Sequence, residues 1–348
     1  MNTDPSSAGR PLILPFAGVR PRLASPPRAC AGEVSILGRV EIGAGSSFGF
    51  GAVVRADGHF VRIGDDVHLG EMATIHIAHD RYPTIIGSRV AAGRDAVLHA
   101  CTIGDDCVVE DEVVILDGSV IENEVVIEAG ATVFPGSRLE AGHLYAGSPA
   151  KPVRRLEAGE LDRRRQAVAG AASRSAADAA GVARAFAEDV FLAANTTVSG
   201  RIRAAARSSI FFGCRLDAGT SEIVLGENTN IQDNTIIDAG DGAVVFGADT
   251  TVGHNVHLRS CRVGDRSLVG IGSDIAPGTV IDDDVMLAGG SVTLPEQRLE
   301  SGWLWGGRPA RPLRRLDDAK RHMIATTVTH YIDYAKAYHL AQAEAPNA

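Results

Sequence analysis

The residues of this chain best suited to chemistry are its eleven histidines. Five of them lie in three short segments, ATIHIAHD at 73–80, DAVLHAC at 95–101 and TVGHNVHLRS at 251–260. A neutral imidazole can ligate a metal ion or transfer a proton near neutral pH. The five cysteines form no CxxC pair, and the serine and cysteine positions show no nucleophile–base arrangement. No glycine-rich loop suits a phosphate group, so a chemical function would depend on the histidines.

The sequence that must position these histidines is duplicated. GHLYAGSPAKPVRRL at 142–156 and GWLWGGRPARPLRRL at 302–316 match at an offset of 160 residues. A long internal repeat of this kind determines the fold before any other feature is considered. We expect a first domain over residues 30–156 and a second over residues 196–316.

A six-residue rhythm runs through both copies. This period is the signature of the left-handed parallel β-helix, in which three short strands form one triangular coil of about eighteen residues. The predicted fold is therefore all-β, with two tandem left-handed β-helices. An aliphatic residue opens each unit of six and points inward, as at Ile103, Ile115, Ile121 and Ile127 in the first copy and at Val263, Val269, Ile275 and Ile281 in the second.

The remaining segments are expected to be accessory. Residues 1–29 form an N-terminal extension, and the Ala- and Arg-rich stretch 157–195 is expected to be a helical linker. Residues 317–348 are predicted to hold a C-terminal helix that covers one side of a β-helix. Its apolar stripe is Ile324, Val328, Tyr331, Ile332, Ala335 and Tyr338.

Bulk composition excludes several classes of function. The net charge of −9 argues against nucleic acid and against an anionic membrane surface as partners. No apolar run is long enough to span a membrane, and the N-terminus has no secretory signal pattern. We expect a cytoplasmic protein with reduced, buried cysteines.

Several motifs resemble the γ-class carbonic anhydrase family. They are AVVRADGHFVRIGDDVHLGEMATIHIAHD at 52–80, IIGSRVAAGRDAVLHACTIGDD at 85–106 and GSPAKP at 147–152. The family pattern runs Arg-x-Asp, Asn-Ile-Gln-Asp-Asn, a first histidine, and then Gly-His-x4-His. In that family zinc lies between subunits, with the first and third histidines from one subunit and the second from its neighbour.

In the first copy, Arg55 and Asp57 match the Arg-x-Asp pair, which braces adjacent subunits in the family. His76 matches the first ligand and His99 the third. Arg94 stands at the position of the second ligand. The first copy therefore keeps two of three ligands.

In the second copy, residues 230–234 match the Asn-Ile-Gln-Asp-Asn segment in full. His254 matches the second ligand, whereas Asp238 and Arg259 stand at the first and third positions. Asp217 and Gly219 fall where the Arg-x-Asp pair would be. The second copy therefore keeps the one ligand that the first copy lacks.

The resemblance implies a composite zinc site of His76, His99 and His254 between a first-type and a second-type domain. The implied activity is reversible hydration of carbon dioxide to bicarbonate by a zinc-bound hydroxide. Iron or cobalt could replace zinc, because imidazole suits all three metals. Gln232 would orient the metal-bound solvent, with Asn230 and Asp233 close by or at the interface.

The proton shuttle and the assembly also follow from the resemblance. His79 or His59 would shuttle protons. The protein is expected to form a homo-oligomer in which β-helices pack side by side, as in the family's closed trimers.

Two alternatives stay open. Hexapeptide β-helices often carry acyl transfer from acetyl-coenzyme A, with a lone histidine such as His99 or His79 as the base. The chain could instead be a non-catalytic assembly or scaffold protein, since Arg94 and Arg259 at ligand positions would repel a dication.

Overall fold

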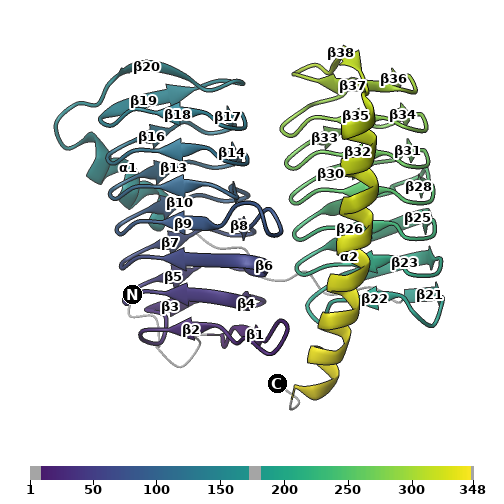
Figure 1. Cartoon of the computed structure of the whole chain (residues 1–348), viewed down its shortest axis with the longest axis horizontal. Coiled ribbons are helices and arrows are strands. Elements are labelled where there is room, and N and C mark those ends of the chain that lie inside the picture. Colours follow the sequence, from purple (N-terminus) through teal and green to yellow (C-terminus); the bar gives the residue numbers. More distant parts are fainter. Residues whose placement is uncertain (1–8, 172–181, 346–348) are drawn as a thin grey trace. The chain divides into compact units, whose positions relative to one another are not determined.

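The computed structural model describes residues 9–171 and 182–345. The described residues up to 171 form one compact unit, and residues 182–344 form a second. Both units consist mainly of short, parallel strands stacked coil upon coil (Figure 1), and each ends in an antiparallel pair; this confirms the predicted β-helix fold. No helix in the described ranges combines the length and the apolar composition that a membrane crossing needs.

The first unit contains two hydrogen-bonded ladders of strands. The first ladder runs β17 (Thr132–Val133), β14 (Val114–Ile115), β11 (Val97–His99), β8 (Thr74–His76), β6 (Val53–Ile63), β9 (Thr84–Ile86), β12 (Thr102–Ile103), β15 (Val120–Ile121) and β18 (Arg138–Leu139). Strand β4 (Ser35–Ile42) also pairs with β6, and β1 (Leu12–Leu14) and β2 (Arg22–Leu23) pair with β4. The second runs β20 (Lys151–Arg155), β19 (His143–Ala146), β16 (Val126–Ile127), β13 (Val108–Val109), β10 (Ala91–Ala92), β7 (His68–Leu69), β5 (Ser47–Phe48) and β3 (Ala29–Cys30). Strands β1 to β3 show that part of the expected N-terminal extension pairs with this unit.

The second unit repeats this plan. Its first ladder runs β33 (Asp274–Ile275), β30 (His257–Arg259), β27 (Ile236–Asp238), β25 (Arg215–Leu225), β28 (Val244–Phe246), β31 (Arg262–Val263), β34 (Val280–Ile281) and β36 (Arg298–Leu299), with β23 (Thr197–Ala204) and β21 (Val182–Phe186) beyond β25. Its second runs β22 (Phe191–Leu192), β24 (Ser209–Ile210), β26 (Asn230–Ile231), β29 (Thr251–Val252), β32 (Leu268–Val269), β35 (Met286–Leu287), β37 (Trp303–Gly306) and β38 (Arg311–Arg315).

The segment expected to be a linker, 157–195, has mixed structure. Helix α1 (Glu160–Ala169) occupies its first part, and residues 172–181 lie outside the described chain. Strands β21 and β22 occupy its last part and pair with β23 and β24. The stacked coils of the second unit thus begin before residue 196, because β21 and β22 belong to its first coil.

Inward-pointing aliphatic side chains form the core of each β-helix. In the first unit Val54, Ile75, Leu98, Ile115 and Val133 occupy paired positions on successive strands, and each is at most 1% exposed. Because parallel strands stack in register, every side chain above and below such a position points into the same core. The six-residue rhythm of the sequence therefore arises because each unit of six supplies one inward-pointing aliphatic residue to this stack.

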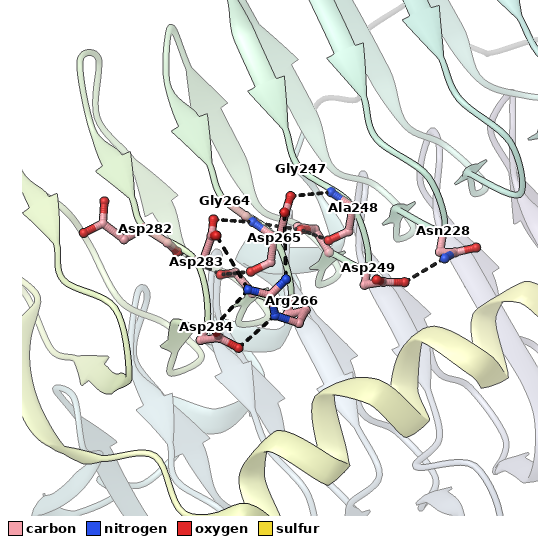
Figure 2. A network of polar contacts seen from close by, with 12 residues as sticks. Asn228, Gly247, Ala248, Asp249, Gly264, Asp265, Arg266, Asp282, Asp283 and Asp284 are labelled. Carbon is pink, nitrogen blue, oxygen red and sulfur yellow. Dashed lines mark hydrogen bonds and ion pairs between the residues drawn. The ribbon is translucent and has the colours of Figure 1, made fainter.

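Turn carboxylates tie successive coils together at one corner of the second unit (Figure 2). The Asp265 carboxylate accepts a hydrogen bond from the backbone N–H of Ala248 at 2.8 Å, and the Asp265 N–H donates to the carboxylate of Asp283 at 2.9 Å. Arg266 donates to both carboxylate oxygens of Asp284 at 3.1 Å. The carboxylates accept hydrogen bonds from backbone N–H groups of the turns, and Arg266 balances the charge of Asp284, which gives the corner a structural role.

Two helices each cover one ladder of their own unit. Helix α1 packs on β10 and β13, whereas the longer α2 (Asp318–Glu344) runs along β22, β24, β26 and β29 (Figure 1). The expected C-terminal helix is confirmed. Its buried stripe holds Tyr334 where Ile332, which is half-buried, was expected. The buried members are Ile324, Val328, Tyr331, Tyr334, Ala335, Tyr338 and Ala341.

Helix α1 is anchored through a buried carboxylate. Glu160 accepts two hydrogen bonds from Arg154, both at 2.8 Å, and one from Arg164 at 3.0 Å. The Arg154 hydrogen bonds, followed by that from the Glu157 backbone N–H, lower the pKa of Glu160 to about 2. A carboxyl whose folded-state pKa is depressed stabilises the fold above its unfolded pKa, and this stabilisation is lost as the pH falls towards 2.

Glu160→Gln is therefore expected to lower the free energy of local unfolding of α1 by about 1–2 kcal/mol at neutral pH. This value is kept small because Arg154 is partly exposed and solvent screens its interaction with Glu160. Amide hydrogen exchange within α1 measures this effect directly. In the wild type the protection of α1 should decrease between pH 4.5 and about 2, and the variant should lack that dependence. Asp162→Asn is the matched control, because the Asp162 side chain is 71% exposed on the same helix. Equal loss of protection in both variants would contradict the role of Glu160.

Candidate metal centre

Two adjacent strands of the first unit bring a pair of histidines together. His76 ends β8 and His99 ends β11, and the two residues are direct partners in the parallel register. Paired positions on stacked strands point to the same side of the ladder. Their rings lie 5.3 Å apart, with His76 Nδ1 3.3 Å from His99 Nε2. Two of the three predicted ligands are thus adjacent within one unit.

The other nitrogen of each ring contacts a carboxylate. His76 Nε2 lies 3.0 Å from Asp57 Oδ2, and His99 Nδ1 lies 2.7 Å from Asp117 Oδ1. Asp57 also pairs with Arg55, and neither of these two side chains is exposed. Since a carboxylate only accepts, each ring carries its proton on the nitrogen that faces the carboxylate. The remaining nitrogen of each histidine then presents a lone pair to the other.

The charge of Asp117 is maintained by its partner. Burial raises the pKa of the Asp117 carboxyl, but its electrostatic interaction and hydrogen bond with His99 act in the opposite direction and hold the pKa below its usual value. The carboxylate is therefore ionised at neutral pH. An ionised acceptor fixes the orientation of the His99 ring, as the partners of metal-binding histidines do.

The spacing of the histidine pair provides a test for a metal. Tetrahedral zinc with Zn–N distances of about 2.0–2.1 Å holds two imidazole nitrogens about 3.3–3.4 Å apart. The separation of His76 Nδ1 and His99 Nε2 is 3.3 Å. The two side chains thus fit a shared zinc ion without rearrangement.

The second unit holds the third histidine. His254 lies in the turn between β29 and β30 and is fully buried. Its Nδ1 lies 3.1 Å from Asp233 Oδ2, and its Nε2 lies 3.4 Å from the hydroxyl of Tyr331 in α2. A second Asp233 oxygen accepts a hydrogen bond from the Phe212 N–H at 3.1 Å. His254 therefore also lies next to a carboxylate, although this contact is outside the hydrogen-bond geometry that His76 and His99 show.

Polar residues of the predicted motif lie at β26, which pairs with β29, the strand that precedes His254. Gln232 donates to Asn230 Oδ1 at 3.2 Å, and Asn230 donates to Thr251 Oγ1 at 2.9 Å. Gln232 is 5% exposed and Asn230 is 1% exposed. Asn230 therefore fixes the orientation of the Gln232 amide.

The positions equivalent to ligands hold ion pairs. Asp238 and Arg259 are direct partners on β27 and β30, as His76 and His99 are on β8 and β11. Arg259 pairs with Asp274. In the first unit Arg94, which stands in the place of His254, lies 3.3 Å from Asp111 and 3.6 Å from Asp95. The arginines thus bind carboxylates of their own unit, in agreement with a substituted rather than a ligating role.

His79 lies outside the histidine pair. It follows β8 in a loop, is half-buried, and adopts a left-handed backbone with φ of 42°. A Cβ at Gly58 would lie 2.9 Å from His79 Nδ1, so the ring passes over Gly58, next to Asp57. The shuttle role of His79 stays a prediction.

Sequence reasoning missed two residues of this region, Asp117 and Tyr331. Asp117 follows His99 by 18 residues, which is one full coil, so the coil length could have located it. Tyr331 lies 77 residues from His254 and reaches it only because α2 packs against the second unit. Sequence spacing therefore carried no signal for Tyr331 beyond its place in the apolar stripe.

Comparison with known proteins finds relatives that are named as carbonic anhydrases. No protein-family model matches the chain. It is 35% identical over 158 residues to "Gamma carbonic anhydrase 2, mitochondrial" of Arabidopsis thaliana, which covers 43% of this chain and 57% of that protein. It is 39% identical over 126 residues to "Probable carbonic anhydrase" of Methanocaldococcus jannaschii, which covers 36% of this chain and 79% of that protein.

A solved structure gives a similar match. The "hexapeptide transferase family protein" from Anaplasma phagocytophilum is 33% identical, covers 46% of this chain and 95% of that chain, and has a TM-score of 0.44. The chain spans just over half the length of the two Arabidopsis relatives, at 57% and 58%.

The stacked coils and the paired histidines define a hexapeptide-repeat β-helix protein with a candidate metal site. The 39% identity over 79% of the Methanocaldococcus protein is high enough to assign the chain to a family. The chain belongs to the γ-carbonic anhydrase-like family.

Proposed function

We propose that this protein is a carbonic anhydrase, which interconverts carbon dioxide and bicarbonate at a zinc site made of His76, His99 and His254. The observation that carries the proposal is the 3.3 Å separation of His76 Nδ1 and His99 Nε2, which matches two ligands of one tetrahedral zinc ion. The first unit supplies these two ligands, and a second unit, of the same chain or of another copy, supplies His254.

The contacts of the three histidines support this assignment. Each has one ring nitrogen next to a carboxylate of its own unit: Asp57 for His76, Asp117 for His99 and Asp233 for His254. Metal-binding histidines almost always have such a partner, because it fixes the tautomer and raises the basicity of the ligand nitrogen.

When bound, zinc supplies the Lewis acidity that makes hydroxide from water at neutral pH. The protein's own residues do the rest. The three carboxylates hold the rings so that their lone pairs are available to the metal. Gln232, held by Asn230, presents an amide to orient solvent, and His79 accepts the proton that is released. The Arg55–Asp57 pair fixes the carboxylate on which His76 depends.

Metal analysis of the full-length protein tests the proposal. After growth with added zinc, we expect about one zinc ion per chain by elemental analysis, since catalytic zinc takes three protein ligands and leaves one position open. Stopped-flow assays should show carbon dioxide hydration that a chelator removes and that zinc restores. Iron and cobalt reconstitution identifies the preferred metal. Less than about half a zinc ion per chain would count against the proposal.

The same preparation tests the acyltransferase alternative, which the hexapeptide repeats of the sequence bring into consideration. Calorimetric titration with coenzyme A should show no binding. Binding of coenzyme A together with an absence of zinc would favour acyl transfer. Absence of both would favour the scaffold alternative.

A further inference from the structure

Helix α2 brings a hydroxyl group to the candidate ligand of the second unit. The Tyr331 hydroxyl lies 3.4 Å from His254 Nε2, and Tyr331 is 5% exposed. Its ring packs edge-on against Phe211, with centroids 5.0 Å apart, and against Tyr334 at 5.3 Å. The aromatic packing fixes the ring, so the hydroxyl has a defined place beside His254.

The direction of this hydrogen bond follows from the other side of the imidazole. His254 Nδ1 lies 3.1 Å from Asp233 Oδ2, and a carboxylate accepts but does not donate. The contact lies outside hydrogen-bond geometry, but the negative charge of Asp233 beside Nδ1 favours the tautomer with its proton on Nδ1, which leaves the lone pair on Nε2. The Tyr331 hydroxyl then donates to Nε2, the atom that a metal ion would need.

We propose that Tyr331 caps the metal-binding nitrogen of His254 and that metal loading displaces its hydroxyl. This inference rests on the proposed function and extends it to α2, which becomes a part of the metal centre as well as a structural cover. Tyr331 is a positioning residue in this scheme. In the metal-free protein its hydroxyl holds the imidazole in place, and it must give up the Nε2 lone pair when the metal binds.

The partners of the two imidazole nitrogens should then have opposite effects on metal affinity. Asp233 supports the ligand from the far side, so Asp233→Asn is expected to weaken metal binding about 10- to 100-fold. Tyr331 competes with the metal for Nε2, so Tyr331→Phe is expected to strengthen it. Since 3.4 Å is long for a hydrogen bond to a hydroxyl, the gain should be modest, about two- to five-fold.

The experiment uses the metal-free full-length protein and titrates cobalt(II) and zinc against a competing chelator. Tyr331→Phe removes only the hydroxyl and keeps the ring that packs on Phe211. The matched control is Tyr334→Phe, because Tyr334 is buried on the same helix and 4% exposed. We expect Tyr331→Phe to bind both metals two- to five-fold more tightly and to load faster, and Tyr334→Phe to match the wild type. The cobalt visible spectrum reports whether the coordination geometry is retained.

The outcomes separate the two proposals. If the wild type binds metal and Tyr331→Phe binds with equal or lower affinity, the cap is wrong while the proposed function stands. If Tyr334→Phe strengthens binding as much as Tyr331→Phe, the effect arises from helix packing, which also overturns the cap. If the wild type binds neither metal, the proposed function itself fails.

Discussion

His254→Ala is expected to abolish zinc binding, although it leaves the histidine pair of the first unit intact. A catalytic zinc site needs about three protein ligands, and two imidazoles from adjacent strands do not retain the ion against a chelator. Bound zinc should fall below about a tenth of the wild-type content, and carbon dioxide hydration should fall to the level of the metal-free protein. Elemental analysis and stopped-flow assays measure the two losses.

The matched control for this variant is His257→Ala. His257 lies three residues further on, in β30, and is half-buried. Its position pairs with Ile236 and Asp274, away from the Asp233 contact of His254. The control should therefore keep its zinc. If His254→Ala kept a full complement of zinc, the division of the ligands between the two units would be wrong.

The two copies differ at carboxylates as well as at histidines. By strand register, Gly219 occupies the place of Asp57, and Pro277 occupies the place of Asp117 one coil beyond Arg259. The second unit has thus lost both carboxylates that orient histidines in the first. Where it keeps a histidine, His254, it also keeps Asp233. Joint loss of ligand and carboxylate in the second unit agrees with the proposed composite site, because the carboxylates there would have no histidine to orient. The first unit differs, since Glu71 keeps a buried carboxylate at the position of Asp233 although Arg94 replaces the histidine.

The fold could be predicted because the feature that produces it, an inward-pointing aliphatic residue, repeats every six residues. Inward aliphatic positions such as Ile115 and Ile275 recur in step with the strands that carry them. The end of each β-helix was equally visible in the matching 142–156 and 302–316 segments. The start of the second unit was not, because the first coil, with β21 and β22, is built from a stretch whose composition is Ala- and Arg-rich.

The site was only partly predictable from spacing. His76 and His99 are 23 residues apart, more than one coil, because the loop after β8 adds residues between two strands that are neighbours in space. Family resemblance identified the pair, and the register of β8 and β11 shows why its members meet. The contact of Tyr331 with His254 depends on the docking of α2, which no local pattern encodes. The division of ligands between units remains a prediction.

Asp57→Asn is expected to reduce the stability of the first unit by about 3–5 kcal/mol, the usual cost of removing one partner from a buried ion pair. Arg55 and Asp57 are both fully buried and in contact, so the variant leaves the guanidinium without this counter-charge. The same change removes the acceptor of His76 Nε2, 3.0 Å away, so zinc affinity should also fall, about 10- to 100-fold.

Spectroscopy can assign the loss to one unit. The chain's two tryptophans, Trp303 and Trp305, lie in the second unit, so their fluorescence in a denaturant titration follows that unit, whereas circular dichroism follows both. For Asp57→Asn, the circular dichroism transition should shift to lower denaturant while the fluorescence transition stays in place. Asp217→Asn is the control, because Asp217 is exposed.

A double variant separates charge burial from metal binding. Arg55→Met with Asp57→Leu replaces the buried pair by apolar side chains, an exchange that is often neutral for stability. It should recover most of the lost stability but none of the lost zinc affinity, because His76 still lacks its carboxylate. Recovery of both would show that Asp57 acts on the metal site only through the stability of the first unit. Full stability of Asp57→Asn alone would mean that the Arg55 charge is compensated without Asp57.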